Sequence, residues 1–315
     1  MKLVVAFLRL IRWPNLVFII LTQFIFLYCI IDPVVSHAID PRFLQKYFII
    51  LVISSVLIAA AGYIINDYFD LNIDAVNKPT RLVVDKVINR RWAILLHLLL
   101  SAIGVALGIW VDIHYNSWWI GLSNLICVLL LFGYSVTLKK KLLIGNVGIS
   151  LLTSWVIAVV FFAFKESASF GPFDPYLINA QLTKLTRLAF LYAGFAFIIS
   201  LIREVVKDME DIDGDRRFGC KTMPIVWGIP ATKVFVAVWI IVMVALVASV
   251  QYYVLQFGWW WSAIYSIMLI IVPLLFILYF LGRAKHASDY RKLSATVKLV
   301  MLTGILSMLF FKIYS

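Results

Sequence analysis

The chain has 315 residues, of which 63% are hydrophobic and only 14% are charged. Soluble domains are usually about 45–50% apolar and about 25% charged, so this composition excludes a water-soluble globular protein and predicts one that lies in a lipid membrane. The formal net charge of +12 does not indicate a nucleic-acid partner, because the basic residues form small groups between apolar runs, as in membrane proteins.

Nine apolar stretches are long enough to cross the hydrocarbon layer, which takes about 20 residues of helix. They predict an all-α, polytopic membrane protein with one domain over residues 1–315, whose helices enclose a central cavity. Arg9 and Arg12 interrupt the first apolar stretch and no small-residue cleavage site follows, so we expect this helix to remain as an anchor. The expected spans are 15–31, 46–65, 92–111, 118–137, 143–164, 186–206, 232–250, 263–281 and 296–314.

The basic residues predict the orientation of these spans. The N-terminus and every second loop after it, counted together with the adjoining ends of the spans, hold 22 of the 28 Lys and Arg residues. Because positively charged loops stay in the cytoplasm, we expect a cytoplasmic N-terminus and an external C-terminus, with a plasma membrane as the location. The long polar loops after the second and sixth spans then lie in the cytoplasm and cap the active site.

Two clusters of aspartates occur at the ends of the second and sixth spans, with one shared spacing. In each cluster three aspartates stand at steps of three and then four residues, which places them on one face of a helix. This spacing predicts two acidic stripes that face each other as an internal repeat. The members are Asp67, Asp70 and Asp74 in the first stripe and Asp208, Asp211 and Asp215 in the second.

Repelling carboxylates at helical spacing need a cation. Mg²⁺ prefers oxygen ligands and is usually held by one or two carboxylates together with substrate phosphates. Basic residues that can bind phosphate oxygens flank both clusters. The sequence therefore predicts a magnesium–diphosphate site on the cytoplasmic side, in which the metal offsets charge on the departing diphosphate. The flanking residues are Lys78, Arg81, Arg203, Lys207, Arg216, Arg217 and Lys221.

The chain resembles the UbiA superfamily of intramembrane prenyltransferases. Residues 66–74 match its N-D-x-x-D-x-x-x-D signature, and the second stripe matches its other Asp-rich segment. Residues 12–15 are similar to the R-x-P-N entry into the first helix, and residues 134–140 to a tyrosine-to-lysine element after the fourth. Within the superfamily, residues 207–224 look most like geranylgeranyltransferases that act on geranylgeranylglyceryl phosphate. The loop after Arg81, which lies near the acceptor in the family, departs from their pattern.

The resemblance implies a site for a prenyl diphosphate and a lipid or aromatic acceptor. In that site Asp67, Asp70, Asp208 and Asp211 are catalytic and hold Mg²⁺, and Asp74 and Asp215 complete the metal clusters. Ionisation of the donor gives an allylic cation, which the acceptor captures. The residues expected to bind substrate are Asn15, Asn66, Lys78, Arg81, Tyr134, Lys139, Lys207 and Lys221.

Two other functions fit the same features. A related enzyme could use an aromatic quinone precursor, such as dihydroxynaphthoate or hydroxybenzoate, as its acceptor. A transporter could bind cations at the acidic clusters, although transporters usually place such sites near the bilayer midplane. The flanking basic residues favour a phosphate-containing substrate over a transported cation.

Overall fold

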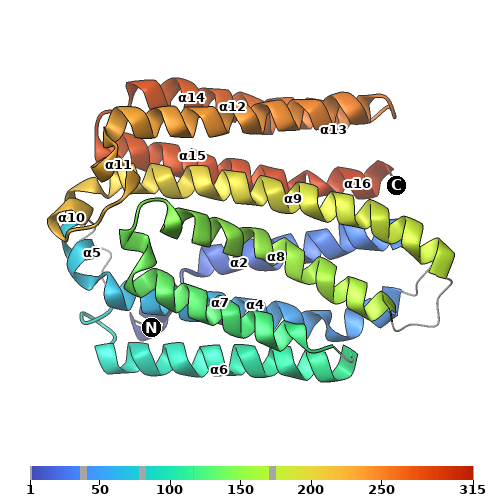
Figure 1. The fold of residues 1–315 in the computed structure, drawn as a ribbon, viewed down its shortest axis with the longest axis horizontal. Helices are drawn as coiled ribbons and strands as arrows, with labels where there is room; N and C mark the ends of the chain where they lie inside the picture. Colours follow the sequence, from blue (N-terminus) through green and yellow to red (C-terminus); the bar gives the residue numbers. More distant parts are fainter. Residues whose placement is uncertain (1, 36–40, 78–82, 116, 170–174, 315) are drawn as a thin grey trace.

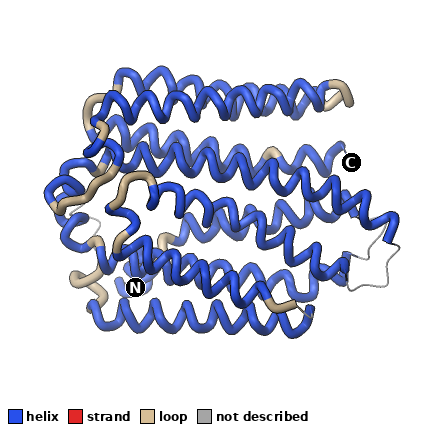
Figure 2. The backbone as a smooth tube through the Cα atoms, viewed as in Figure 1, coloured by secondary structure: helices blue, strands red, loops and turns tan. Residues whose placement is uncertain are grey.

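The computed structural model describes residues 2–35, 41–77, 83–115, 117–169 and 175–314, and within these ranges it contains helices and no strand (Figures 1 and 2). The helices of the first half are α1 (Lys2–Leu10), α2 (Trp13–Ile25), η1 (Phe26–Ile31), α3 (Asp32–Val35), α4 (Pro41–Phe69), α5 (Leu71–Asn77), α6 (Arg90–Tyr115), α7 (Trp119–Val136), η2 (Leu138–Lys140) and α8 (Ile144–Ser169). Those of the second half are α9 (Pro175–Glu210), α10 (Ile212–Arg217), α11 (Met223–Val226), α12 (Gly228–Leu255), α13 (Trp260–Ser266), η3 (Ile267–Ile271), α14 (Val272–Arg283), α15 (Ala287–Leu306) and α16 (Met308–Tyr314).

Nine candidate membrane spans lie in the described residues, which confirms the expected all-α polytopic class. They are Trp13–Val35, Tyr47–Phe69, Arg90–His114, Trp119–Val136, Ile144–Lys165, Asn179–Glu210, Gly228–Leu255, Trp260–Arg283 and Ala287–Tyr314. The sixth span is longer at both ends than the sequence indicated, because charged and polar residues extend α9 as helix beyond its apolar centre. Its last turn therefore carries part of the second acidic stripe.

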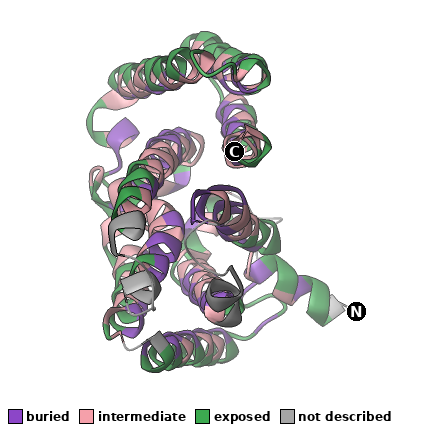
Figure 3. Cartoon of the chain, turned by 90° about the vertical axis from the view of Figure 1, so that its right-hand side faces the viewer, coloured by how far each residue is buried: buried purple, intermediate pink, exposed green. Residues whose placement is uncertain are grey.

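The outer faces of the helices are apolar. On α6 and α7 the exposed side chains include Leu98, Leu99 and Leu129, each more than half exposed. Figure 3 shows exposed residues gathered on the outside of the bundle and buried ones on the inside. So much exposed apolar surface is unfavourable in water and favourable in lipid.

Two spans contain a π-helical segment, and both segments come shortly before a proline. Pro33 follows η1 and Pro273 follows η3. Proline has no backbone N–H and its ring clashes with the preceding turn, so the helix must readjust its hydrogen bonding at that point. These prolines account for the local widening of the first and eighth spans.

The short helices α5 and α10 lie side by side at one end of the bundle, and the C-terminus lies at the other end (Figure 1). The loops after the second, fourth and sixth spans also gather at the end that holds α5 and α10. The two acidic clusters, 134 residues or more apart in sequence, are thus brought to the same end. This arrangement positions the candidate site.

Candidate active site

A cavity of about 260 Å³ lies inside the bundle below the end that carries α5 and α10. Its walls come from the first, second, fourth, fifth, sixth and ninth spans. The lining combines charged residues with aliphatic ones, and smaller polar side chains such as Ser55, Asn124 and Thr153 stand among the aliphatic residues. The polar and aromatic residues of the lining include Arg12, Asn15, Tyr63, Asn66, Tyr134, Arg203, Glu204, Lys207 and Lys298.

The first acidic stripe continues from α4 into α5 across a break at Asp70. The backbone N–H of Asp70 donates to Asn66 O at 3.0 Å, and that of Asp74 donates to Asp70 O at 2.7 Å. Helical i to i−4 bonding therefore persists through the break and keeps the three aspartates on one face. All three are half-buried, as the spacing predicts for one shared face.

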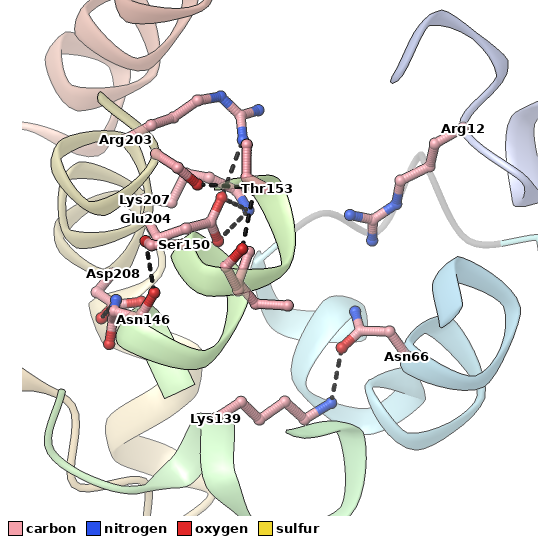
Figure 4. A network of polar contacts seen from close by, with 12 residues as sticks. Arg12, Asn66, Lys139, Asn146, Ser150, Thr153, Arg203, Glu204, Lys207 and Asp208 are labelled. Carbon is pink, nitrogen blue, oxygen red and sulfur yellow. Dashed lines mark hydrogen bonds and ion pairs between the residues drawn. The ribbon is translucent and has the colours of Figure 1, made fainter. Parts of the chain in front are cut away.

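Cations already neutralise two carboxylates of this stripe. Arg12 Nη2 donates to Asp67 Oδ1 at 2.6 Å, and Lys139 Nζ lies 2.5 Å from Asp70 Oδ1. Asn66 contacts both members of the second pair: its Nδ2 donates to Asp70 Oδ2 at 2.9 Å, and its Oδ1 accepts from Lys139 Nζ at 3.3 Å. Figure 4 shows Arg12, Asn66 and Lys139 together on one side of the site.

Arg12 adopts an unusual backbone conformation. It is the N-cap of α2 with φ 50° and ψ 52°, the left-handed region that costs a non-glycine residue about 1–3 kcal/mol. Pro14 fixes the first turn of α2 directly after it. Burial is the largest single influence and lowers the pKa of the Arg12 guanidinium, but Asp67, Tyr63 and Asp74 together outweigh it and hold this pKa above its ordinary value. Arg12 therefore stays charged and aimed at the stripe.

The second acidic stripe runs from the end of α9 into α10, again across a break, at Asp211. The N–H of Asp211 donates to Lys207 O at 2.9 Å, and that of Asp215 donates to Asp211 O at 3.1 Å. The stripe aspartates are half-buried, whereas Asp213, which is off the stripe, is exposed. The two stripes therefore share the same local architecture.

Asp208 is held by a neutral partner. Asn146 Nδ2, from the first turn of α8, donates to Asp208 Oδ2 at 2.8 Å. Within the part of the chain that the structure describes, Asp208 makes no ion pair. One turn earlier on α9, Glu204 pairs with both Arg203, at 2.9 Å, and Lys207, at 3.0 Å. Figure 4 places this group across the site from Arg12 and Asn66.

One side chain bridges the two acidic ends. Asn77, the last residue of α5, donates from Nδ2 to Asp211 O at 3.0 Å, and its Oδ1 accepts the N–H of Gly214 at 2.9 Å. A Cβ at position 214 would lie only 2.5 Å from the Asn77 amide, so the contact requires glycine there. A second link joins the loops farther out, where Lys221 N donates to Lys140 O at 2.7 Å.

The structure brings most of the expected site residues together. Asn15, Asn66, Tyr134 and Lys207 line the cavity, and Lys139 contacts the first stripe. The exposed Lys221 is not in the cavity lining, although its backbone joins the loop that carries Lys139. Lys78 and Arg81 lie outside the described residues.

The donor set suits magnesium with phosphate rather than a closed metal site. Among the residues that the structure describes, no three His, Cys, Asp or Glu side chains are close enough to hold a metal by themselves. Mg²⁺ usually keeps waters and shares its ligands between one or two carboxylates and substrate phosphates. The stripe aspartates are not among the described lining residues, but their sequence neighbours Asn66 and Lys207 are, so each stripe lies beside the cavity. One or two carboxylates from each stripe fit the magnesium requirement, and Arg12 and Lys139 supply part of the positive charge.

Several residues of the site could not be assigned a role from the sequence. Asn146 and Lys298 lie in long apolar runs, and their only signal is a polar side chain inside an expected span. Arg203 and Glu204 were visible as charges near the second stripe, but not as an ion pair facing the cavity. Asn77 follows the first stripe closely, and nothing in the sequence indicates its partner on α10.

A second cavity, of about 150 Å³, adjoins the first, and its lining is mostly apolar. The two cavities share five lining residues, which are Phe18, Ile19, Thr153, Val156 and Met301. The second cavity continues between the first, fifth, sixth, seventh, eighth and ninth spans. Together they form a polar mouth that leads to an apolar interior.

Residues 11–304 match the model of the UbiA prenyltransferase family. The chain belongs to the UbiA prenyltransferase family. This confirms the resemblance seen in the sequence, and a UbiA-family protein with this site is a prenyltransferase rather than a cation transporter. The chain is similar to the digeranylgeranylglyceryl phosphate synthase of Methanosphaera stadtmanae, at 28% identity over 83% of this chain and 87% of that protein. It is also similar to the synthase of that name from Methanothermobacter thermautotrophicus, at 32% identity over 73% of this chain and 72% of that protein.

Solved structures share the fold of this UbiA-family chain. A structure described as digeranylgeranylglyceryl phosphate synthase in membranes matches with a TM-score of 0.59 and 23% identity, over 98% of this chain and 99% of that one. A UbiA homologue from Archaeoglobus fulgidus, bound to DMAPP and Mg²⁺, matches with a TM-score of 0.54 and 16% identity, over 96% and 99% of the two chains. At these identities the likeness establishes the fold alone.

Proposed function

We propose that this UbiA-family enzyme transfers a geranylgeranyl group from its diphosphate to geranylgeranylglyceryl phosphate, in a reaction that requires Mg²⁺. The observation that carries the proposal is the contact between α5 and α10, which joins the ends of the two aspartate stripes beside a cavity that is lined by their sequence neighbours Asn66 and Lys207. The names of the relatives at 28% and 32% identity support the two substrates. The homologue from Archaeoglobus fulgidus, bound to a prenyl diphosphate and Mg²⁺, supports the metal.

In this proposal Asp67, Asp70, Asp208 and Asp211 bind the metal ions against the donor diphosphate. Asp74 and Asp215, one turn farther along each stripe, complete the two sets of carboxylates. Magnesium supplies the positive charge that offsets the developing charge on the leaving diphosphate. The Asn77 bridge holds the two stripes at a fixed separation.

The neutral and basic residues orient the diphosphate. Asn66 fixes the rotamer of Asp70 and the direction of the Lys139 ammonium. Lys139 and Lys207 stand near the two stripes, where each can donate to phosphate oxygens. We assign the same role to Lys78, Arg81 and Lys221 in the adjoining loops, and a position beside the reacting carbon to Tyr134, which lines the cavity.

The cavity walls protect the reaction from water. An allylic cation is destroyed by hydrolysis, so it must form where water is excluded. Ile58, Leu131 and Val156 line the cavity below the polar mouth. Tyr63 and Tyr134 also face this space, and aromatic faces attract cations. The hydroxyl of the acceptor then captures the cation.

We also propose that the whole chain acts as one domain in the plasma membrane, with the site and the N-terminus in the cytoplasm. The support is the 22 of 28 basic residues in the N-terminus, the alternate loops and the adjoining ends of the spans. A cysteine placed at exposed Asp213 and another at exposed Gln256, directly after the seventh span, give the test. In right-side-out vesicles an impermeant maleimide should label position 256 and not position 213, and labelling of position 213 there would contradict this orientation.

A screen of donors against acceptors tests the reaction. Purified enzyme is given geranylgeranyl, farnesyl or geranyl diphosphate with geranylgeranylglyceryl phosphate, dihydroxynaphthoate or hydroxybenzoate, and products are identified by mass. We expect transfer of geranylgeranyl to the glyceryl phosphate, and loss of turnover with EDTA. Product from an aromatic acceptor alone would show that the second candidate is correct.

Matched variants connect this activity to the site. Asp67→Asn combined with Asp208→Asn should abolish release of diphosphate, because one carboxylate is lost from each stripe. Asp213→Asn changes an exposed aspartate between two stripe positions and should leave turnover unchanged. Equal turnover in the double variant and the control would contradict the assigned roles.

A further inference from the structure

One wall of the cavity carries more positive charge than its carboxylates balance. Arg203 and Lys207 on α9 and Lys298 on α15 all line this wall. Glu204 is the single acidic residue of the described lining, and it pairs with both Arg203 and Lys207. Three cations and one carboxylate leave this wall with a formal charge of +2. Such an excess beside apolar walls is unfavourable unless an anion binds there.

Lys298 is the cation without a carboxylate partner. Its Nζ donates to Asn15 Oδ1 at 2.7 Å and lies 5.0 Å from the centre of the Phe18 ring. Within the described part of the chain Lys298 has no ion pair. An amide oxygen and a ring face orient the ammonium but do not neutralise it.

Arg203 offers a second unused donor on this wall. Its Nη1 donates to Glu204 at 2.9 Å, whereas its Nε is buried and has no hydrogen-bond partner in the described residues. A buried N–H without a partner is costly, and it commonly marks a place that a ligand fills. The unpaired Lys298 and the unused Nε of Arg203 lie on neighbouring helices that pack together along their lengths.

The apolar space beyond Lys298 indicates what kind of anion binds. Along α15 and into the start of α16, Met301, Gly304, Ile305 and Met308 line the second cavity, starting one turn after Lys298. That face of the helix runs for roughly 10 Å. Lys298 and Met301 line the main cavity, and Met301 lines the second cavity as well, so a ligand can span both spaces. The shape suits an anionic head joined to a long apolar tail.

We propose that Arg203, Lys298 and Asn15 form a binding site for the phosphate monoester of the lipid acceptor, whose isoprenoid tail lies in the second cavity. A phosphate monoester carries up to two negative charges near neutral pH, which matches the +2 charge of the wall. The donor diphosphate binds separately, at the aspartate stripes. The proposal rests on the proposed function for the identity of the acceptor.

The first experiment compares two acceptors that differ in the phosphate alone, geranylgeranylglyceryl phosphate and geranylgeranylglycerol. In Lys298→Gln, which keeps a side chain able to bond to Asn15, the KM for the phosphate acceptor should rise about 10- to 100-fold, as expected for one lost charge-assisted contact. The KM for the donor and the rate with the alcohol should stay unchanged. Lys298→Arg should restore most of the affinity.

The matched control is Lys292→Gln, an exposed lysine on the same helix, which should leave both KM values unchanged. Arg203→Gln provides an independent variant, should Lys298→Gln not fold. It should likewise raise the KM for the phosphate acceptor and leave the donor KM unchanged. An unchanged KM for the phosphate acceptor in both variants would overturn the proposal. So would an equal rise in the donor KM, because the cations would then serve the diphosphate.

The second experiment measures binding without chemistry. Radiolabelled geranylgeranylglyceryl phosphate is equilibrated with the enzyme in detergent, with EDTA and no donor. Binding that weakens about 10-fold or more in Lys298→Gln supports the site even if the enzyme forms no product, in which case the proposed function alone fails. Turnover with unchanged binding overturns the site and leaves the proposed function intact.

Competition distinguishes the possible sources of the phosphate. Inorganic phosphate lacks a tail and should compete only weakly, and vesicles of phosphatidylglycerol, a phosphodiester with one charge, should compete less than the acceptor. Equal competition by inorganic phosphate would overturn the assignment of the tail to the second cavity. Equal competition by the vesicles would show a general lipid-headgroup site and overturn the assignment to the acceptor.

Discussion

The two acidic stripes have one spacing, but their aspartates have different kinds of partner. In the first stripe, Asp67 is paired with Arg12 at 2.6 Å and Asp70 with Lys139 at 2.5 Å. In the second, Asp208 is held by the neutral amide of Asn146 at 2.8 Å. Identical sequence patterns thus do not give identical sites. The partners that neutralise a carboxylate come from other helices.

This difference has a consequence for metal binding. A carboxylate that already has a close cation gains less from Mg²⁺, because the incoming ion must compete with or repel that cation. A carboxylate with only an amide partner gains the full attraction. We therefore expect Asp208 to contribute more to magnesium affinity than Asp67 or Asp70 does, and the cations paired with Asp67 and Asp70 to turn toward the diphosphate.

The largest expected effect tests this asymmetry directly. Asp208→Asn should lower kcat/KM by about 10³-fold, because the loss of a metal contact at a developing charge costs several kcal/mol. The variant should also need much more Mg²⁺ for half-maximal rate than Asp67→Asn does. Turnover measured against Mg²⁺ concentration checks this. Equal magnesium requirements in the two variants would contradict the expected difference between Asp208 and Asp67.

The next effect concerns the cation of the first stripe. Lys139→Met should lower kcat by about 10- to 100-fold, since it removes a charge-assisted donor to phosphate. The magnesium concentration for half-maximal rate should fall or stay the same, because Asp70 loses its competing cation. The exposed Lys141→Met in the same turn is the control. A raised magnesium requirement in Lys139→Met would contradict the proposed competition.

A smaller effect is expected from separating the stripes. In Gly214→Ala the new Cβ would lie 2.5 Å from the Asn77 amide, so Asn77 must move and lose its two hydrogen bonds to α10. We expect the contact between α5 and α10 to lose about 1–3 kcal/mol of stabilising free energy. We also expect kcat/KM to fall about 10-fold. Gly194→Ala on α9, whose Cβ would meet nothing within 4 Å, is the control. Normal kinetics in Gly214→Ala would mean that the spacing of the stripes is not critical.

The smallest effect is one of reactivity. Burial, and then the Asp215 carboxylate, raise the pKa of the Cys220 thiol to about 11. A raised pKa keeps the neutral thiol at pH 7–8, so alkylation should be slow there and should accelerate as the pH approaches 11. Iodoacetamide labelling of a protein with serine at positions 29 and 127 measures this. Asp215→Asn should raise the rate at pH 8, and an unchanged rate would place Asp215 farther from the thiol.

The sequence by itself determined the all-α class, the nine spans and the two stripes. These features depend on local properties: the length of apolar runs sets the spans, and steps of three and four residues set the faces. Even at Asp70 and Asp211, where the helices break, the backbone bonds keep the predicted register. The extension of the sixth span at its start was not predictable, because the charged residues Lys184 and Arg187 interrupt the apolar run there.

Only the tertiary structure decided which residues act on each stripe. Arg12 meets Asp67 across 55 positions and Asn77 meets Asp211 across 134, and such pairs leave no periodic signal in the chain. The same holds for Lys298, which is 283 residues from Asn15 and lines the cavity through the packing of the first and ninth spans. Local patterns fix where the acids stand, whereas the helix packing fixes their charge balance, because that balance depends on side chains that arrive from distant helices.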